Sequence, residues 1–172
     1  MFKLLVIAGL FYSLLILFEI RLSPQLHSWL YGYFPHSFAQ QARFDGFRSV
    51  AFMGHGLLVA FFVVIIVISA TALWNNRIKI RQFSPRMVSY YMLMVLVLSK
   101  SVAALSYGIF SFLVLKKMKV KTQHRIAVIL VILTMFYPAM SIMKIFPHQP
   151  LINIAKSIDE DRAQSLQFRF DN

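Results

Sequence analysis

The sequence contains no cysteine, which excludes disulfide bonds, thiolate metal ligands and cysteine nucleophiles. Charge is also scarce: Asp, Glu, Lys and Arg make up 14% of the chain, whereas a soluble domain has about 25%. Acids are rarest, with 6 Asp and Glu against 18 Lys and Arg. Such a chain has too little charge for the surface of a soluble domain.

Apolar residues dominate instead, at 59% of the chain with 17 Phe and 9 Met. This composition indicates an all-α integral membrane protein. The basic residues occur in short clusters between apolar runs, a pattern that membrane topology and anionic lipid headgroups explain. Since the sequence has neither an RNP-like aromatic stripe nor a helix-turn-helix pattern, we expect no nucleic-acid partner.

We predict a single membrane domain over 1–172, with full spans at about 2–20, 50–74 and 126–146. The first run could also be a signal peptide, but no small-x-small cleavage site follows it. Trp74 closes the second span at the position of an interfacial anchor.

The apolar stretch 87–115 is too long for one upright span. As a single helix it would measure about 43 Å at 1.5 Å per residue, against a hydrocarbon core of about 30 Å. In its middle lie Ser99, Lys100 and Ser101, which are poor residues to expose to lipid. We therefore weigh a broken or re-entrant helical hairpin against one long tilted helix.

Charge favours the hairpin. Loops 75–86 and 116–125 each carry four or more basic residues and no acid, so the positive-inside rule makes both cytoplasmic. An even number of crossings must then separate them, which places a turn at Ser99–Ser101. In that arrangement 21–49 and 147–172 are interfacial segments on the opposite, non-cytoplasmic side.

The segment 21–49 is rich in aromatic residues, among them Trp29, Tyr31 and Tyr33. Such residues suit a segment lying along the membrane surface. They could also form a platform for sugar rings, next to Arg43 and Arg48, which we expect on the outer surface as donors to phosphate oxygens. We predict no metal site, because the histidines of this segment lack a third ligand at metal spacing.

Two ionisable residues lie within predicted spans. His55, between Gly54 and Gly56, is either a hydrogen-bonding partner of a neighbouring helix or a base or phosphate contact near the outer face. Lys100 would be the deepest charge. It is a functional candidate because burying an unpaired charge is costly, unless it reaches the interface by snorkelling.

The tail 157–172 predicts a helix that starts with a capping box, Ser157 with Glu160. Arg162 and Arg169 are seven residues apart and so lie on nearly the same helical face. An amphipathic interfacial helix explains the pattern, and two aligned guanidinium groups would also suit a lipid pyrophosphate.

Three stretches, RFDGFRSVAFMGHGLLVAFF, LSKSVAAL and DRAQSLQFRFDN, together resemble the O-antigen polymerase and ligase superfamily, most closely its exopolysaccharide polymerases. The resemblance implies a multi-pass protein of the bacterial inner membrane. It implies a glycosyltransferase that joins undecaprenyl-diphosphate-linked glycans at the periplasmic face, without metal, cofactor or nucleotide sugar. The expected partners are lipid-linked oligosaccharide, membrane lipids and other polysaccharide-assembly proteins.

By this resemblance the catalytic candidates are His55, Arg48 and Arg169, and Arg43 and Arg162 bind substrate. The residue pattern adds Lys100 and Tyr33 to the substrate-binding candidates. Members of the superfamily are far longer, so we expect this chain to be a fragment. The alternative function is a non-enzymatic membrane scaffold or transporter subunit that binds anionic lipid.

Overall fold

The computed structural model describes residues 1–23, 25–34, 46–80 and 83–142, with side chains up to residue 138. The regular elements in these ranges are all helices: α1 (Phe2–Leu22), α2 (Leu26–Tyr31), α3 (Gly56–Asn75), α4 (Pro85–Leu98), α5 (Val102–Lys117) and α6 (Val120–Ile142). Of these, α1, α3 and the Val120–Pro138 part of α6 are long and apolar enough to cross a membrane. The predicted all-helical fold class is confirmed over the described residues, with three helices that could span a membrane.

The chain forms two compact units, Met1–Val120 and Lys121–Asn172. In the second unit the described part of α6 has no buried side chain, and its apolar residues from Val128 to Tyr137 are exposed. Such a surface suits lipid or a further protein segment. The first unit holds the remaining helices.

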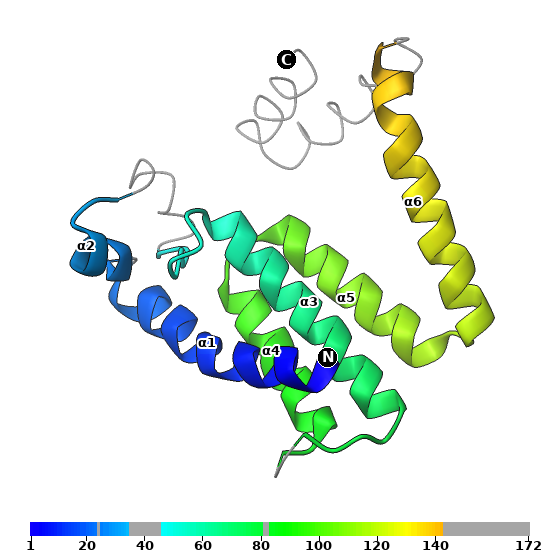
Figure 1. The fold of residues 1–172 in the computed structure, drawn as a ribbon, viewed down its shortest axis with the longest axis horizontal. Coiled ribbons are helices and arrows are strands. Elements are labelled where there is room, and N and C mark those ends of the chain that lie inside the picture. Colours follow the sequence, from blue (N-terminus) through cyan, green and yellow to red (C-terminus); the bar gives the residue numbers. More distant parts are fainter. Residues whose placement is uncertain (24, 35–45, 81–82, 143–172) are drawn as a thin grey trace. The chain divides into compact units, whose positions relative to one another are not determined.

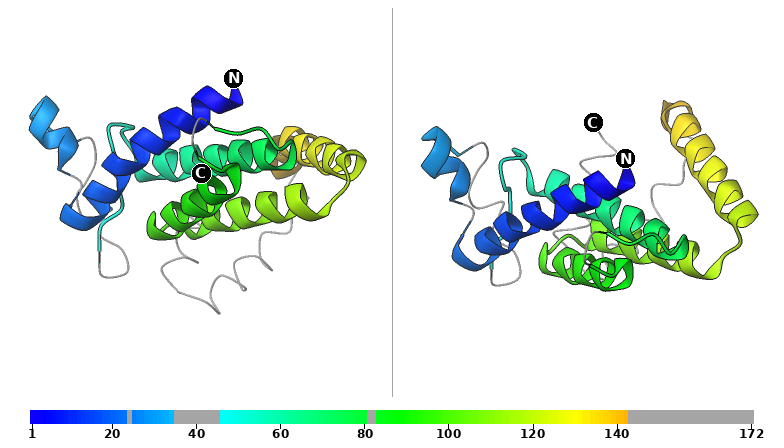
Figure 2. Two further views of the ribbon diagram at one scale, coloured as in Figure 1. Left: turned by 90° about the horizontal axis from the view of Figure 1, so that it is seen from below. Right: turned by 60° about the horizontal axis from the view of Figure 1, so that its bottom comes forward.

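Helix α3 is the centre of the first unit (Figure 1). It packs against α1, α4 and α5, and the two views of Figure 2 show it between α1 and α5. Two clusters of buried side chains follow its length. The first comprises Ile16, Ala51, Val59, Ala60, Val63, Val64, Val95, Leu96 and Ala104, and the second comprises Val6, Ile66, Val67, Ala70, Leu73, Ile80, Val88 and Met92.

The clusters give the helix directions. Helix α1 contributes Val6 to the cluster near the end of α3 and Ile16 to the one near its start, so α1 and α3 are antiparallel. Helix α4 likewise runs antiparallel to α3, with Val88 in the second cluster and Leu96 in the first. Helix α5 then returns parallel to α3.

Small and polar residues let these helices pack closely, as is common between helices in membranes. A Cβ atom on Gly9 would lie 2.8 Å from Cγ1 of Ile66, so α1 approaches α3 where α1 has no side chain. Hydroxyl groups also link the helices: the Ser13 and Tyr91 oxygens are 2.8 Å apart, and those of Thr71 and Ser89 are 2.7 Å apart. These contacts join α1 and α3 to α4.

We call the end of the bundle that surrounds Trp74, at the end of α3, the basic end. Lys116 Nζ lies 3.4 Å from the centroid of the Trp74 ring and donates a hydrogen bond of 3.2 Å to Asn75 Oδ1. The Asn75 amide in turn donates to the Leu115 carbonyl at 2.7 Å, and Arg86 lies 5.8 Å from the Trp74 centroid. The loop before α4 and the end of α5 therefore share one end of the first unit, as their charge predicted.

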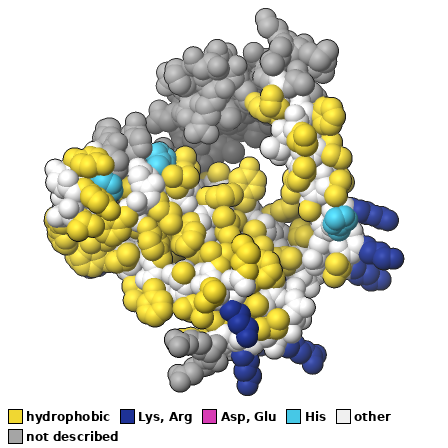
Figure 3. Space-filling view, in the orientation of Figure 1, with side chains coloured by type: hydrophobic (Ala, Val, Ile, Leu, Met, Phe, Trp, Pro, Cys, Tyr) yellow, Lys and Arg dark blue, Asp and Glu magenta, His cyan; other side chains and the backbone are white. Residues whose placement is uncertain are grey.

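Figure 3 shows hydrophobic side chains over much of the described surface, with Lys and Arg side chains in two groups, at the bottom and at the right-hand edge. Large apolar residues of α1, such as Leu4, Phe11 and Leu14, are exposed. Contiguous apolar surface of this kind is rare in soluble monomers and fits contact with lipid.

The stretch 87–115 is not one long helix. Helix α4 ends at Leu98 and α5 begins at Val102, so the helix breaks at Ser99–Ser101, where the sequence predicted a turn. Lys100 has a left-handed backbone (φ +53°), which ends the helical path. That the pair re-enters a membrane stays a prediction.

The predicted span 50–74 starts six residues too early, because α3 begins at Gly56. Residues 50–55 are apolar enough for a helix, but Ala51, Phe52 and Gly54 have positive φ values of 39°, 65° and 76°. The backbone there turns toward α1 instead of joining the helix.

We predict that Gly9→Leu destabilises the bundle, because the new side chain would overlap Ile66 in a packed interface. Overpacking of this kind costs about 1–3 kcal/mol, and thermal unfolding in detergent would measure the loss. Ala8→Leu is the matched control, since Ala8 is exposed on the same helix. Equal stability of the two variants would contradict the packing described here.

Candidate functional site

Glu19 is the innermost charged group at the other end of the bundle. The buried positions of α1 are Val6, Gly9, Ser13, Ile16 and Glu19, at helical spacing, so the carboxylate lies on the face that packs into the bundle. Its side chain is 0% exposed. We call this end, with Glu19 and the segment 46–55, the polar end.

The Glu19 carboxylate binds the backbone that leads into α3. Its Oε2 atom accepts hydrogen bonds from Ser49 Oγ at 2.9 Å, Val50 N at 2.7 Å and Ala51 N at 2.6 Å. Non-helical backbone in an apolar interior must find partners for its N–H groups. Glu19 supplies them from a position 30 to 32 residues earlier in the chain.

Arg48 is buried within the polar end. Only 5% of its surface is exposed. Its aliphatic chain crosses Gly56, where a Cβ atom would lie 2.6 Å from Arg48 Cδ. Gly56 is therefore required for Arg48 to fold inward, which the sequence pattern alone did not indicate.

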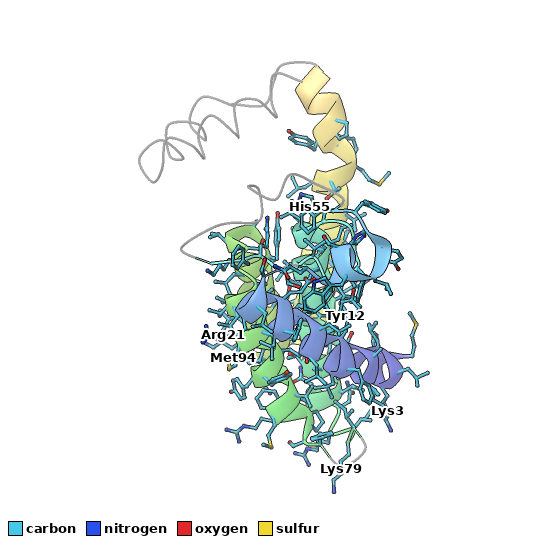
Figure 4. All side chains as sticks on the ribbon, turned by 90° about the vertical axis from the view of Figure 1, so that its left-hand side faces the viewer. Lys3, Tyr12, Arg21, His55, Lys79 and Met94 are labelled. Atoms are coloured by element: carbon cyan, nitrogen blue, oxygen red, sulfur yellow. The ribbon has the colours of Figure 1, made fainter. Side chains whose placement is uncertain are left out.

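The sequence predicted that His55 lies within a span. In the structure it is the N-cap of α3, just before the helix begins. Its Nδ1 atom accepts a hydrogen bond of 3.0 Å from the Leu57 backbone N–H. A ring nitrogen that accepts cannot carry a proton, so the ring has its proton on Nε2 in this arrangement. The ring is partly exposed at the polar end, and Figure 4 shows it at the opposite end from Lys79.

Lys100 turns back toward the same segment. Its Nζ atom lies against Gly46, two residues before Arg48, so that a side chain at Gly46 would collide with it. The flanking Ser99 and Ser101 are buried, and Ser99 Oγ donates to the Leu96 carbonyl at 2.6 Å. The helix break therefore delivers Lys100 to the polar end, in place of a lipid-facing position.

Tyr33 belongs to an aromatic group beside the polar end. Its carbonyl is 3.0 Å from His27 Nδ1, and its ring stacks edge-on against the His27 ring at 5.1 Å. Tyr31 connects the group to the segment 46–55 through its contact with Phe52, at 6.1 Å between ring centroids. Tyr33 itself is exposed, in keeping with an interfacial aromatic residue.

The structure thus brings Arg48, His55 and Lys100 to one end of the bundle, with Tyr33 beside them. The remaining predicted site residues, Arg43, Arg162 and Arg169, lie outside the described residues. Among the residues described, no group of three His, Asp or Glu side chains is placed to hold a metal ion.

Sequence reasoning missed the central role of Glu19. A signal was present: Glu19 continues the helical spacing of small and apolar residues that face the bundle. An acid at such a position needs internal donors. The sequence could not show that these donors are the amides of Val50 and Ala51.

Comparison of the chain with models of known protein families, with curated proteins and with solved structures gives no match.

We predict that His55→Ala destabilises the protein by about 0.5–2 kcal/mol, because the first turn of α3 loses its cap. His55→Asn should be close to wild type in stability, since Asn is a good N-cap. Unfolding in detergent measures both variants. If Asn destabilises as much as Ala, the imidazole has a structural role other than capping.

Proposed function

We propose that this chain belongs to a membrane glycosyltransferase that polymerises or ligates glycans carried on undecaprenyl diphosphate. The observation that supports the proposal is the approach of two cations, Arg48 and Lys100, to one short segment at the end of the bundle opposite the basic loops. A diphosphate is the part of such a substrate that cations recognise. The resemblance of the sequence to O-antigen polymerases and ligases led to the same substrate class.

In the proposed reaction an acceptor hydroxyl oxygen forms a bond with the anomeric carbon of the donor glycan. The bond from that carbon to the diphosphate oxygen breaks, and its electron pair leaves with the lipid diphosphate. The acceptor proton passes to a base or to water. Arg48 and Lys100 would act by stabilising the charge that grows on the leaving diphosphate, with Arg169 as a further donor from the tail.

The cap favours one of two roles for His55. Because Nδ1 accepts from Leu57, the proton of the ring is on Nε2. His55 is then better suited to donate a hydrogen bond to the diphosphate than to remove the acceptor proton. Arg43, Arg162 and Tyr33 complete the proposed substrate contacts, with the tyrosine ring stacking on a sugar.

The proposed location is the bacterial inner membrane, with the polar end on the periplasmic side. The positive-inside rule supports this orientation, because Arg77, Lys79, Arg86 and Lys116 lie at the basic end. Lipid-linked oligosaccharide would then reach the polar end from the outer leaflet.

A second candidate is a non-enzymatic scaffold or transporter subunit that binds anionic lipid. The burial of Arg48, at 5% exposure, favours it, because an arginine whose aliphatic chain packs over Gly56 is well placed to support the fold. The two candidates differ in what the removal of Arg48 does to glycan length.

We predict that Arg48→Ala, His55→Asn and Arg169→Ala each shorten the polysaccharide made by cells in which they replace the natural protein. His55→Asn keeps the helix cap, so a shorter polymer would report on the imidazole itself. Gel electrophoresis of the polymer measures the length distribution. Arg86→Ala is the control, because it removes a cation at the basic end and should leave the ladder unchanged. Wild-type ladders from all three variants would reject the enzyme.

We also predict that cysteines placed at Gln40 and at Gln164 both react with a membrane-impermeant thiol reagent in intact spheroplasts. Lys79→Cys should react only after permeabilisation, because it lies at the basic end. The natural chain has no cysteine, so each variant carries a single thiol. Labelling of only one of the two outer positions would exclude a shared periplasmic site.

A further inference from the structure

We propose that Glu19 is a positioning residue: its carboxylate holds residues 49–51 against α1 and thereby sets the place of Arg48. The part that concerns Arg48 as a ligand contact rests on the proposed function. The part that concerns the backbone stands on geometry alone.

The burial of Glu19 makes its bonds decisive. A carboxylate removed from water is costly unless hydrogen bonds replace its hydration. Here one oxygen, Oε2, accepts all three bonds, at 2.6 to 2.9 Å, from a hydroxyl and two successive backbone amides. Bonds to a charged acceptor are the stronger class of hydrogen bond.

The segment depends on Glu19 as much as Glu19 depends on the segment. Val50 and Ala51 are 0% exposed, so water cannot serve their N–H groups. Ala51 and Phe52 also hold left-handed φ values, which non-glycine residues keep only where the surroundings enforce them. The Glu19 bonds are the contacts that enforce this path, aided by the turn in which Met53 N donates to the Val50 carbonyl at 2.9 Å.

The bonds of Glu19 affect the position of Arg48 because Arg48 directly precedes Ser49 in the chain. Ser49 donates to Glu19, and its carbonyl oxygen packs at Gly56 beside the Arg48 side chain. If residues 49–51 are released, Arg48 loses the backbone anchor that directs it over Gly56. Glu19 thus acts on the site through the segment and need not touch a ligand.

The two carboxylate oxygens suggest the deciding substitutions. Oε1 is buried and has no hydrogen-bond partner among the described residues. Glu19→Gln can place its amide oxygen at the three donors and its nitrogen in the Oε1 position, so it should preserve the path. Glu19→Asp keeps the charge but is one methylene too short to reach the donors.

The test is hydrogen–deuterium exchange on the full-length protein in detergent, read on peptides that cover residues 49–53. We expect Glu19→Ala and Glu19→Asp to raise exchange there by about tenfold or more, because the two amides lose their acceptor. Glu19→Gln should stay within about threefold of wild type. Ser13→Ala is the matched control, because Ser13 lies on the same face of α1 and its buried hydroxyl bonds to Leu10 and Tyr91 instead. This variant should leave the exchange of the 49–53 peptides unchanged.

Ser49→Ala provides a variant that removes one donor and leaves the buried acid in place, in case Glu19→Ala does not fold. It should raise exchange at the same peptides by a smaller factor. Unchanged exchange in Glu19→Asp and Ser49→Ala, or exchange in Glu19→Gln as fast as in Glu19→Asp, would overturn the positioning role.

Polymer length separates this proposal from the proposed function. Glu19→Asp should shorten the polymer and Glu19→Gln should restore it, while Arg48→Ala should shorten the polymer without raising exchange at 49–53. If exchange behaves as expected but Arg48→Ala, His55→Asn and Arg169→Ala all give wild-type polymer, the enzyme proposal fails and the positioning role stands. If Glu19→Asp raises exchange with wild-type polymer, the link to Arg48 is wrong.

Discussion

The polar end of this protein depends on one buried carboxylate and the three donors that bind one of its oxygens. Glu19 is the single acid of α1, and it faces the bundle because of its helical phase. Through Ser49, Val50 and Ala51 it ties the first helix to the entry of the central helix. The start of α3, the burial of Arg48 and the cap at His55 all follow the path that these bonds impose.

Local patterns predicted the elements whose causes are local. The apolar run after Lys3 predicted α1. The two basic loops without acids, which flank the stretch 87–115, predicted the break at Ser99–Ser101. The start of α3 was not predictable in this way, because it is set by an acceptor about 30 residues away. The burial of Arg48 was not predictable for a similar reason, because its inward path depends on the missing side chain of Gly56, eight residues later in the chain.

The first unit separates two uses of positive charge. At the basic end, Lys116 and Arg86 contact the Trp74 ring, an arrangement common where a protein meets lipid headgroups. At the polar end, Arg48 and Lys100 lie against backbone at Gly56 and Gly46, two positions where a side chain would exclude them. Cations at the first end lie over an aromatic ring, whereas those at the second end are arranged within the fold, which is where the proposed recognition of a charged group would occur.

The lengths of α4 and α5 have a consequence for the surrounding lipid. With 14 and 16 residues they rise about 21 and 24 Å, whereas a hydrocarbon core is about 30 Å thick and α3, with 20 residues, matches it. In the proposed membrane arrangement, a bilayer beside this hairpin would relieve the mismatch by thinning on the side of the turn. Headgroups and water would then approach Ser99–Ser101, where the Lys100 ammonium lies beside Gly46.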